Sequence, residues 1–134
     1  MHLVKKLAGY FDKREEIAFA FLFGSQASGL AIPSSDIDVA IYFYPKTRRP
    51  IEFEEPIHYE KESEIWAELE RLLKKEVELL VLNRAPATIS ASAIRGIPIA
   101  IRDWGLYLDF LQVVTTEAAD FRDLLIRDFL ERKV

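Results

Sequence analysis

One glycine, one serine and two aspartates are the residues of this chain best placed to do chemistry. Gly24 and Ser25 stand together, ten residues (26 to 35) follow, and Asp36 and Asp38 then form an Asp-x-Asp motif. In an extended chain these two carboxylates project to the same side, where they repel each other unless a cation lies nearby. Mg²⁺ suits such a site, because it takes oxygen ligands and leaves positions open for water and substrate phosphates.

The Gly-Ser pair suits the phosphate half of such a site. Glycine lets the backbone approach a phosphate closely, and Ser25 can begin a short helix whose free N–H groups attract anions. Unbroken apolar runs of strand length, 17–23 and 39–43, lie directly before the pair and directly after Asp38. We therefore expect two buried strands to hold the glycine, the serine and the aspartates together.

This motif resembles the signature of the DNA polymerase beta-type nucleotidyltransferase superfamily. Within it, the chain is most similar to the minimal nucleotidyltransferases (MNT), which are paired with HEPN-domain partners in prokaryotic toxin–antitoxin modules. The family pattern has a third carboxylate on a later strand, and Glu78, in the apolar stretch 76–82, fits that place. Glutamate departs from the commonest pattern, since it reaches one methylene further than aspartate. The resemblance covers residues 17 to about 103.

The resemblance implies a metal-dependent transfer of AMP from ATP to a hydroxyl. The β- and γ-phosphates would lie against Gly24 and Ser25. Asp36 and Asp38 would hold one Mg²⁺ and would share a second with Glu78, which would lower the pKa of the incoming hydroxyl. The acceptor implied is a tyrosine of the HEPN toxin, so that this chain would act as the antitoxin. The nucleotide base and the acceptor are not fixed by any residue of the chain.

Each of these residues also has a plain structural interpretation. Asp36 could be a turn residue or a helix cap, and Asp38 could pair with an arginine. Glu78 could be a solvated residue of a half-exposed strand, and Glu76, which has the same strand parity, is a rival ligand. Ser25 could simply cap its helix, although capping and phosphate binding use the same geometry.

Two other functions fit the sequence. A non-catalytic binding module would neutralise its partner by complex formation, with a vestigial metal site. A small-molecule nucleotidyltransferase of the antibiotic type would be completed by dimerisation. The intact Gly-Ser and Asp-x-Asp motifs favour an enzyme, because a pure binding module does not need them.

The length of the chain predicts one domain over residues 1–134. The alternation of strand and helix patterns is typical of an α/β or an α+β fold. The length of the chain allows one core, and the resemblance implies an α+β fold: a small mixed sheet of three to four strands with helices mainly on one face. The core spans about 17–103 and a long C-terminal helix about 106–132. The expected strands are 17–23, 36–43, 76–82 and 97–101, and the expected helices are 3–14, 25–28, 59–74, 86–94 and 106–132.

Composition narrows the partners and the compartment. The formal net charge of −4 argues against a nucleic-acid partner, which needs a basic surface. The absence of cysteine fits a reducing cytoplasm, and the N-terminus begins with a charged amphipathic pattern where a signal peptide would be apolar. No apolar run has membrane-spanning length, so we expect a cytoplasmic protein without a membrane anchor.

Three further features concern surfaces. Arg48 and Arg49, with Lys46, lie in a loop between two prolines, and we interpret the arginines as plain surface residues. Trp66 falls on the inward stripe of its helix. The C-terminal helix is apolar over a broad surface, which favours contact with a partner helix or with another copy, whereas the alternative is a helix packed entirely on its own domain.

Overall fold

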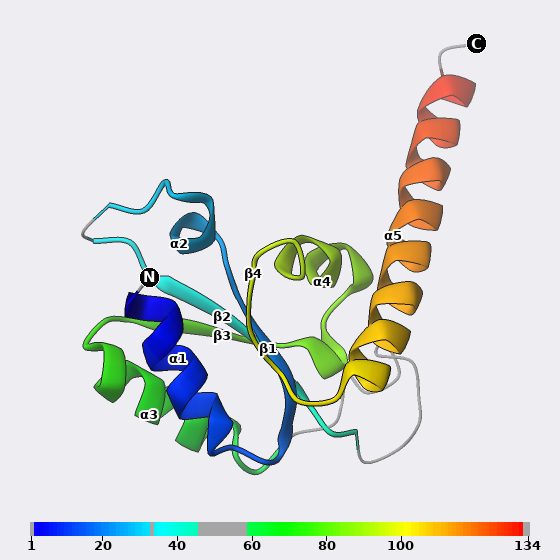
Figure 1. Cartoon of the computed structure of the whole chain (residues 1–134). Coiled ribbons are helices and arrows are strands. Elements are labelled where there is room, and N and C mark those ends of the chain that lie inside the picture. The colour runs from blue at the N-terminus through cyan, green and yellow to red at the C-terminus, as the bar shows by residue number, and fades with distance from the viewer. Residues whose placement is uncertain (1, 33, 46–58, 133–134) are drawn as a thin grey trace.

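The computed structural model describes residues 2–32, 34–45 and 59–132, which form one four-stranded sheet with helices on both faces (Figure 1). The strands are β1 (Ile17–Phe23), β2 (Ile37–Phe43), β3 (Val77–Val81) and β4 (Ile97–Ile101), in the spatial order β3-β2-β1-β4. Both β2 and β4 run antiparallel to β1, and β3 runs parallel to β2. The expectation of a mixed α+β sheet is confirmed.

The helices are α1 (His2–Asp12), α2 (Ser25–Ser28), α3 (Glu62–Leu73), α4 (Ala87–Ala93) and α5 (Trp104–Arg132), with a 3-10 turn, η2 (Leu82–Arg84), after β3. The short helix α2 ends as predicted at Gly29, whose φ of +79° is left-handed. In the described residues, no helix is both long and apolar enough to cross a membrane. Lys46, Arg48 and Arg49, for which we predicted a surface loop, lie outside the described residues.

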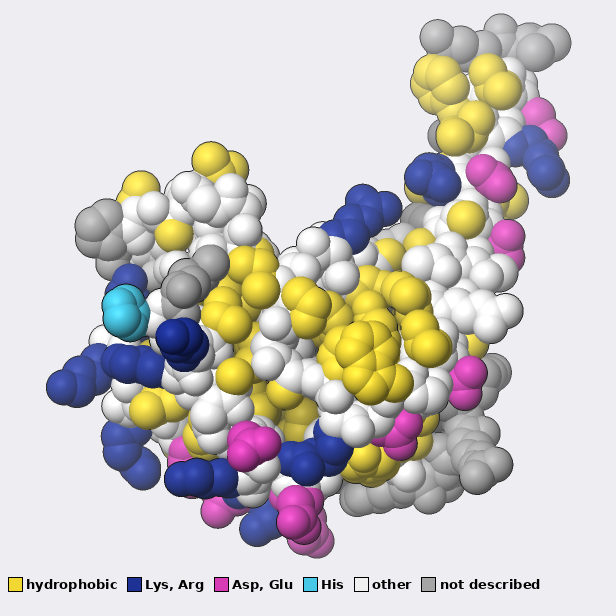
Figure 2. All heavy atoms as spheres, viewed as in Figure 1, with side chains coloured by type: hydrophobic (Ala, Val, Ile, Leu, Met, Phe, Trp, Pro, Cys, Tyr) yellow, Lys and Arg dark blue, Asp and Glu magenta, His cyan; other side chains and the backbone are white. Residues whose placement is uncertain are grey.

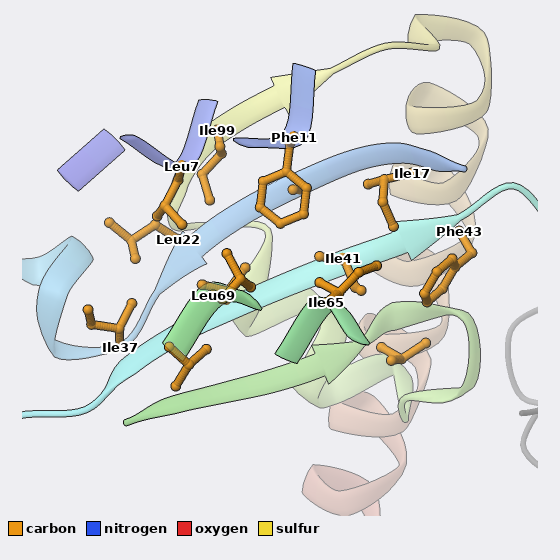
Figure 3. Packing of buried hydrophobic residues seen from close by; sticks show 14 of the residues in the cluster. Leu7, Phe11, Ile17, Leu22, Ile37, Ile41, Phe43, Ile65, Leu69 and Ile99 are labelled. Carbon is orange, nitrogen blue, oxygen red and sulfur yellow. The ribbon is translucent and has the colours of Figure 1, made fainter. Parts of the chain in front are cut away.

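Helices α1 and α3 cover one face of the sheet (Figure 3). Alternate residues of each strand point to this face, as the pleat requires. Leu7 and Phe11 from α1 and Ile65 and Leu69 from α3 are fully or almost fully buried against them. The strand residues of this cluster include Ala20, Leu22, Ile37, Val39, Ile41, Phe43, Val77 and Val81.

Helices α4 and α5 cover the opposite face, so the expectation of helices mainly on one face needs correction. There Phe19 stacks on Tyr42 with 4.7 Å between ring centroids, and Phe110 of α5 packs 4.8 Å from Tyr42. The physical reason is the composition of β1, whose first six residues are apolar and buried regardless of the face they point to. Such a strand needs a cover on both sides.

Helix α5 packs on the sheet only over its first half. Phe110 and Val114 are buried, whereas Leu124, Leu125, Ile126 and Leu130 are each more than half exposed. Figure 1 shows this end of α5 extending beyond the sheet, and Figure 2 shows apolar side chains at its tip. The last turns of α5 therefore do not pack on the domain, and this excludes the alternative of a helix packed entirely on its own domain.

Two side chains hydrogen-bond to the backbone of strands β2 and β3. Asn83 in η2 is fully buried; its Oδ1 accepts from the Phe43 N–H at 2.8 Å, and its Nδ2 donates to the Phe43 carbonyl at 2.9 Å. Trp66 does not point inward as its helical position predicts: it is 44% exposed, and its Nε1 donates to the Val77 carbonyl at 2.8 Å. The indole N–H takes the partner that the strand edge offers, which turns the ring to the surface.

Candidate active site

The turn between β1 and α2 brings the backbone against Asp38. Gly24 adopts φ +71° and ψ −150°, a conformation that residues with a side chain rarely take. A Cβ built there would lie 2.1 Å from Asp38 Oδ2. Only glycine therefore allows this carboxylate to lie beside the turn.

Helix α2 begins immediately after this glycine. The carbonyl of Gly24 accepts from the N–H groups of Ala27 and Ser28, whereas those of Ser25 and Gln26 precede the first hydrogen bond of the helix. Gly24 holds the N-cap position, and the N-terminus of α2 has no side-chain cap among the described contacts. The capping alternative for Ser25 is thus not supported, and two N–H groups at the turn lack an intrahelical partner.

Asp38 lies at the centre of the predicted set. In the sheet it stands opposite Phe23 of β1 and opposite Glu78 of β3. The pKa of the Asp38 carboxyl group is raised to about 6. Burial is the main cause, followed by the hydrogen bond and charge of Glu78 and then by the charge of Asp36. The structure thus brings the three predicted carboxylates into one electrostatic group.

The register of β3 separates the two rival glutamates. Glu76 precedes the strand and its carbonyl accepts from the Ile37 N–H, whereas Glu78 is the residue paired with Asp38. Both glutamate side chains are exposed, as is Asp36 just before β2. Geometry therefore favours Glu78 as the third carboxylate.

The residues present fit a divalent cation by their chemistry. Among residues 2–32, 34–45 and 59–132, no three acidic or histidine side chains already gather closely enough to form a ligand set. Burial, and after it the charges of Glu78 and Asp36, nevertheless disfavour a negative charge on Asp38 and raise its pKa. A Mg²⁺ ion supplies the charge that would offset this effect, and carboxylate oxygens are the ligands it prefers.

Sequence reasoning missed a hollow of about 360 Å³ beside this group. It is lined by residues of α3 and of β3: Glu62, Ser63, Trp66, Val77, Glu78 and Leu79. Glu62, a buried acid, is paired with Arg84 and also accepts from the Tyr59 N–H at 2.9 Å. No sequence signal marks this hollow, because it depends on how α3 lies along the outer edge of β3.

Comparisons with known proteins place the chain in a family. A family model described as Polymerase beta, Nucleotidyltransferase matches residues 5–104, and a search of curated proteins finds no match. Among solved structures, a chain of a toxin–antitoxin complex with AMP-PNP is 18% identical, with a TM-score of 0.65 and coverage of 95% of this chain and 98% of that chain.

Two other solved structures have the same fold. A chain of the toxin–antitoxin complex MntA-HepT is 16% identical, with a TM-score of 0.59 over 97% of this chain and 99% of that chain. A chain from a complex of tri-AMPylated Shewanella oneidensis HEPN toxin with MNT antitoxin is also 16% identical, with a TM-score of 0.58 over 95% and 98% of the two chains. The family model covers well over half of the sequence, and the chain belongs to the polymerase beta nucleotidyltransferase family.

Proposed function

We propose that this nucleotidyltransferase moves AMP from ATP to a hydroxyl on a HEPN-type partner protein and thereby acts as the antitoxin of a toxin–antitoxin pair. One observation carries the catalytic part: Asp38 lies in register with Glu78, and its carboxylate lies beside the Gly24 turn, in a chain of this family. The protein-acceptor part is supported by structural neighbours that include AMP-PNP and an AMPylated HEPN toxin.

Different residues of the site would bind the phosphates and the metal ion. The N–H groups of Ser25 and Gln26, which have no partner within α2, would bind the β- and γ-phosphates together with the close backbone of Gly24. Asp36, Asp38 and Glu78 would hold Mg²⁺. When bound, this ion supplies charge that stabilises the attacking and leaving oxygens.

The chain itself contributes orientation more than reactivity. Asp38 is fixed by its place in β2 and by the glycine turn, while Glu78 is fixed by the register of β3. Carboxylates held on neighbouring strands lose little entropy when a nucleotide binds, so much of the alignment for transfer is present beforehand. No covalent enzyme intermediate is needed.

The exposed end of α5 is the surface we propose for the partner. The stripe that buries Phe110 and Val114 continues in line to Leu125, which is exposed, with Leu124 and Ile126 beside it. The MntA-HepT complex and the complex of HEPN toxin with MNT antitoxin each contain a chain similar to this one together with a second protein. Capping this apolar end would remove several large side chains from water, each worth about 1.5 to 3 kcal/mol when fully buried.

Labelled transfer tests the catalytic proposal. The protein is incubated with ATP labelled at the α-phosphate, Mg²⁺ and the HEPN protein, and label on the HEPN protein is counted and located by mass spectrometry. We expect label with the wild type and a loss of at least 100-fold in the double variant Asp36→Asn/Asp38→Asn. Asp109→Asn, which removes one carboxylate at an exposed site on α5, serves as the control and should keep full transfer.

The exposed apolar end of α5 also favours a second candidate, a binding module that neutralises its partner without chemistry. The same double variant discriminates between the two. If it still neutralises the HEPN protein while the wild type never labels it, complex formation is the function. If neutralisation and labelling are lost together, the enzyme is the function.

A further inference from the structure

The outer edge of β3 is open for pairing at Leu79, as the direction of the backbone shows. Within the part of the chain that the structure describes, β3 is at the end of the sheet, and its only strand neighbour is β2. The Glu76 carbonyl accepts from Ile37 of β2, and successive residues of a strand direct their N–H and C=O groups to opposite sides. The backbone N–H and C=O groups of Glu76 and Glu78 therefore point toward β2, whereas those of Val77 and Leu79 point outward, away from the sheet.

Helix α3 already occupies the edge at Val77. The Val77 N–H donates to Glu70 Oε2 at 2.9 Å, and the Val77 carbonyl accepts from Trp66 Nε1 at 2.8 Å. Two residues further on, no group of the described residues hydrogen-bonds to the outward N–H and C=O of Leu79. Leu79 instead lines the hollow of about 360 Å³, together with Trp66 and Glu78.

The hollow and the carboxylates share one residue. Glu78 lines the hollow and lies in register with Asp38 on the neighbouring strand. In neighbouring strands, residues in register point their side chains to the same face. A residue of an added strand opposite Glu78 would therefore point toward the carboxylates, and a residue opposite Leu79 would point to the α3 side, where Trp66 is exposed.

We propose that the acceptor protein binds here as a short extended segment. Its backbone hydrogen-bonds to Leu79, its hydroxyl side chain stands opposite Glu78, and a neighbouring apolar side chain lies against Trp66. Protein segments commonly bind by adding a strand to a sheet edge, and β3 offers Leu79 for such pairing. The inference rests on the proposed function and adds to it the place and the conformation of the acceptor.

The proposed transfer of AMP to this segment forms one bond and breaks one bond at the α-phosphorus. The hydroxyl oxygen of the acceptor forms a bond to the α-phosphorus of ATP, and the bond from that phosphorus to the bridging oxygen of the β-phosphate breaks. Pyrophosphate leaves, and the hydroxyl proton passes to solvent water. The products are the AMP-modified side chain and pyrophosphate.

Amide exchange in the wild-type protein tests the site without any variant. The HEPN protein is added in the presence of Mg²⁺ and a non-hydrolysable ATP analogue, and exchange is followed residue by residue. We expect the Leu79 amide to exchange at least tenfold more slowly in the complex. The Val77 amide, which is already bonded to Glu70, should change little and serves as the internal control. Unchanged exchange at Leu79 in a formed complex would overturn the proposal.

A pair of variants gives an independent kinetic test. Leu79→Pro removes the outward N–H and leaves the β2 side of the strand intact, whereas Leu79→Ala shortens the side chain and keeps the N–H. With the HEPN protein as acceptor, we expect kcat/KM for the acceptor to fall at least tenfold further in Leu79→Pro than in Leu79→Ala, with an unchanged Kd for Mg²⁺–ATP. Equal acceptor kinetics in the two variants would contradict the site. A wild type that binds Mg²⁺–ATP but labels no acceptor would instead refute the proposed function, and the site with it.

Discussion

Replacing Gly24 with alanine tests the geometry of the candidate site through two separable effects. The first is on stability, because φ +71° with ψ −150° lies in a region that only glycine occupies readily, and a side chain there costs about 1 to 3 kcal/mol. The second is on Asp38, because the new Cβ would lie 2.1 Å from Oδ2 and 3.0 Å from Cγ. The carboxylate can rotate away, so the clash displaces Asp38 more than it unfolds the protein.

Two measurements separate these effects. Urea unfolding of the metal-free protein should show Gly24→Ala to be less stable by about 2 kcal/mol, within the range expected for such backbone strain. Calorimetric titration should show the affinity for Mg²⁺–ATP reduced at least tenfold, which corresponds to about 1.4 kcal/mol, because Asp38 no longer lies beside the turn.

Gly29→Ala is the matched control for this prediction. Gly29 also has a positive φ, +79°, but nothing lies within 4 Å of a Cβ built there. The variant should lose about 1 kcal/mol of stability from its left-handed backbone and keep its affinity for Mg²⁺–ATP. The reasoning is refuted if Gly24→Ala binds Mg²⁺–ATP as tightly as Gly29→Ala does.

Three further substitutions test the electrostatics and the packing. The pKa of Asp38 is about 6 in the folded protein against roughly 3.9 in an unfolded chain, so the folded state holds this proton more tightly and the stability of the metal-free protein falls as pH rises from about 4 to 7. Asp38→Asn should therefore increase the free energy of unfolding by about 1 to 1.5 kcal/mol at pH 7.5, after discounting for solvent exposure, and should leave it unchanged at pH 3. Urea unfolding at the two pH values measures this difference. Gly96→Ala should lower Tm markedly, because its Cβ would lie 2.1 Å from a backbone carbonyl of β1, whereas Gly9→Ala, in open space on α1, should be neutral or stabilising by calorimetry. Asn83→Ala should cost about 2 to 4 kcal/mol in urea unfolding, since it leaves a buried N–H and a buried carbonyl of β2 without partners.

Local patterns predicted the elements that depend on local physics. The strands 17–23 and 97–101 were predicted with their observed bounds, because an apolar run ends at Gly24 in the first case and follows the helix-breaking Gly96 in the second. Helix α2 was predicted to end at Gly29, since a glycine can take the left-handed cap.

Features that depend on distant parts of the chain could not be predicted in the same way. Helical spacing assigned Trp66 to the inward face, but the Val77 carbonyl at the strand edge binds its indole N–H and holds the ring near the surface. Strand parity left Glu76 and Glu78 equivalent, and only the register with β2 places Glu78 beside Asp38. The bidentate contact of Asn83 with β2 spans 40 residues of sequence and leaves no local pattern.

A crystal structure with Mg²⁺ and a non-hydrolysable ATP analogue would test the central claim most directly. The account predicts a metal ion coordinated by Asp36 and Asp38, with Glu78 within its reach, and the triphosphate against the backbone of Gly24 and Ser25. A triphosphate bound elsewhere on the protein, or a metal ion without any of these three carboxylates among its ligands, would contradict it.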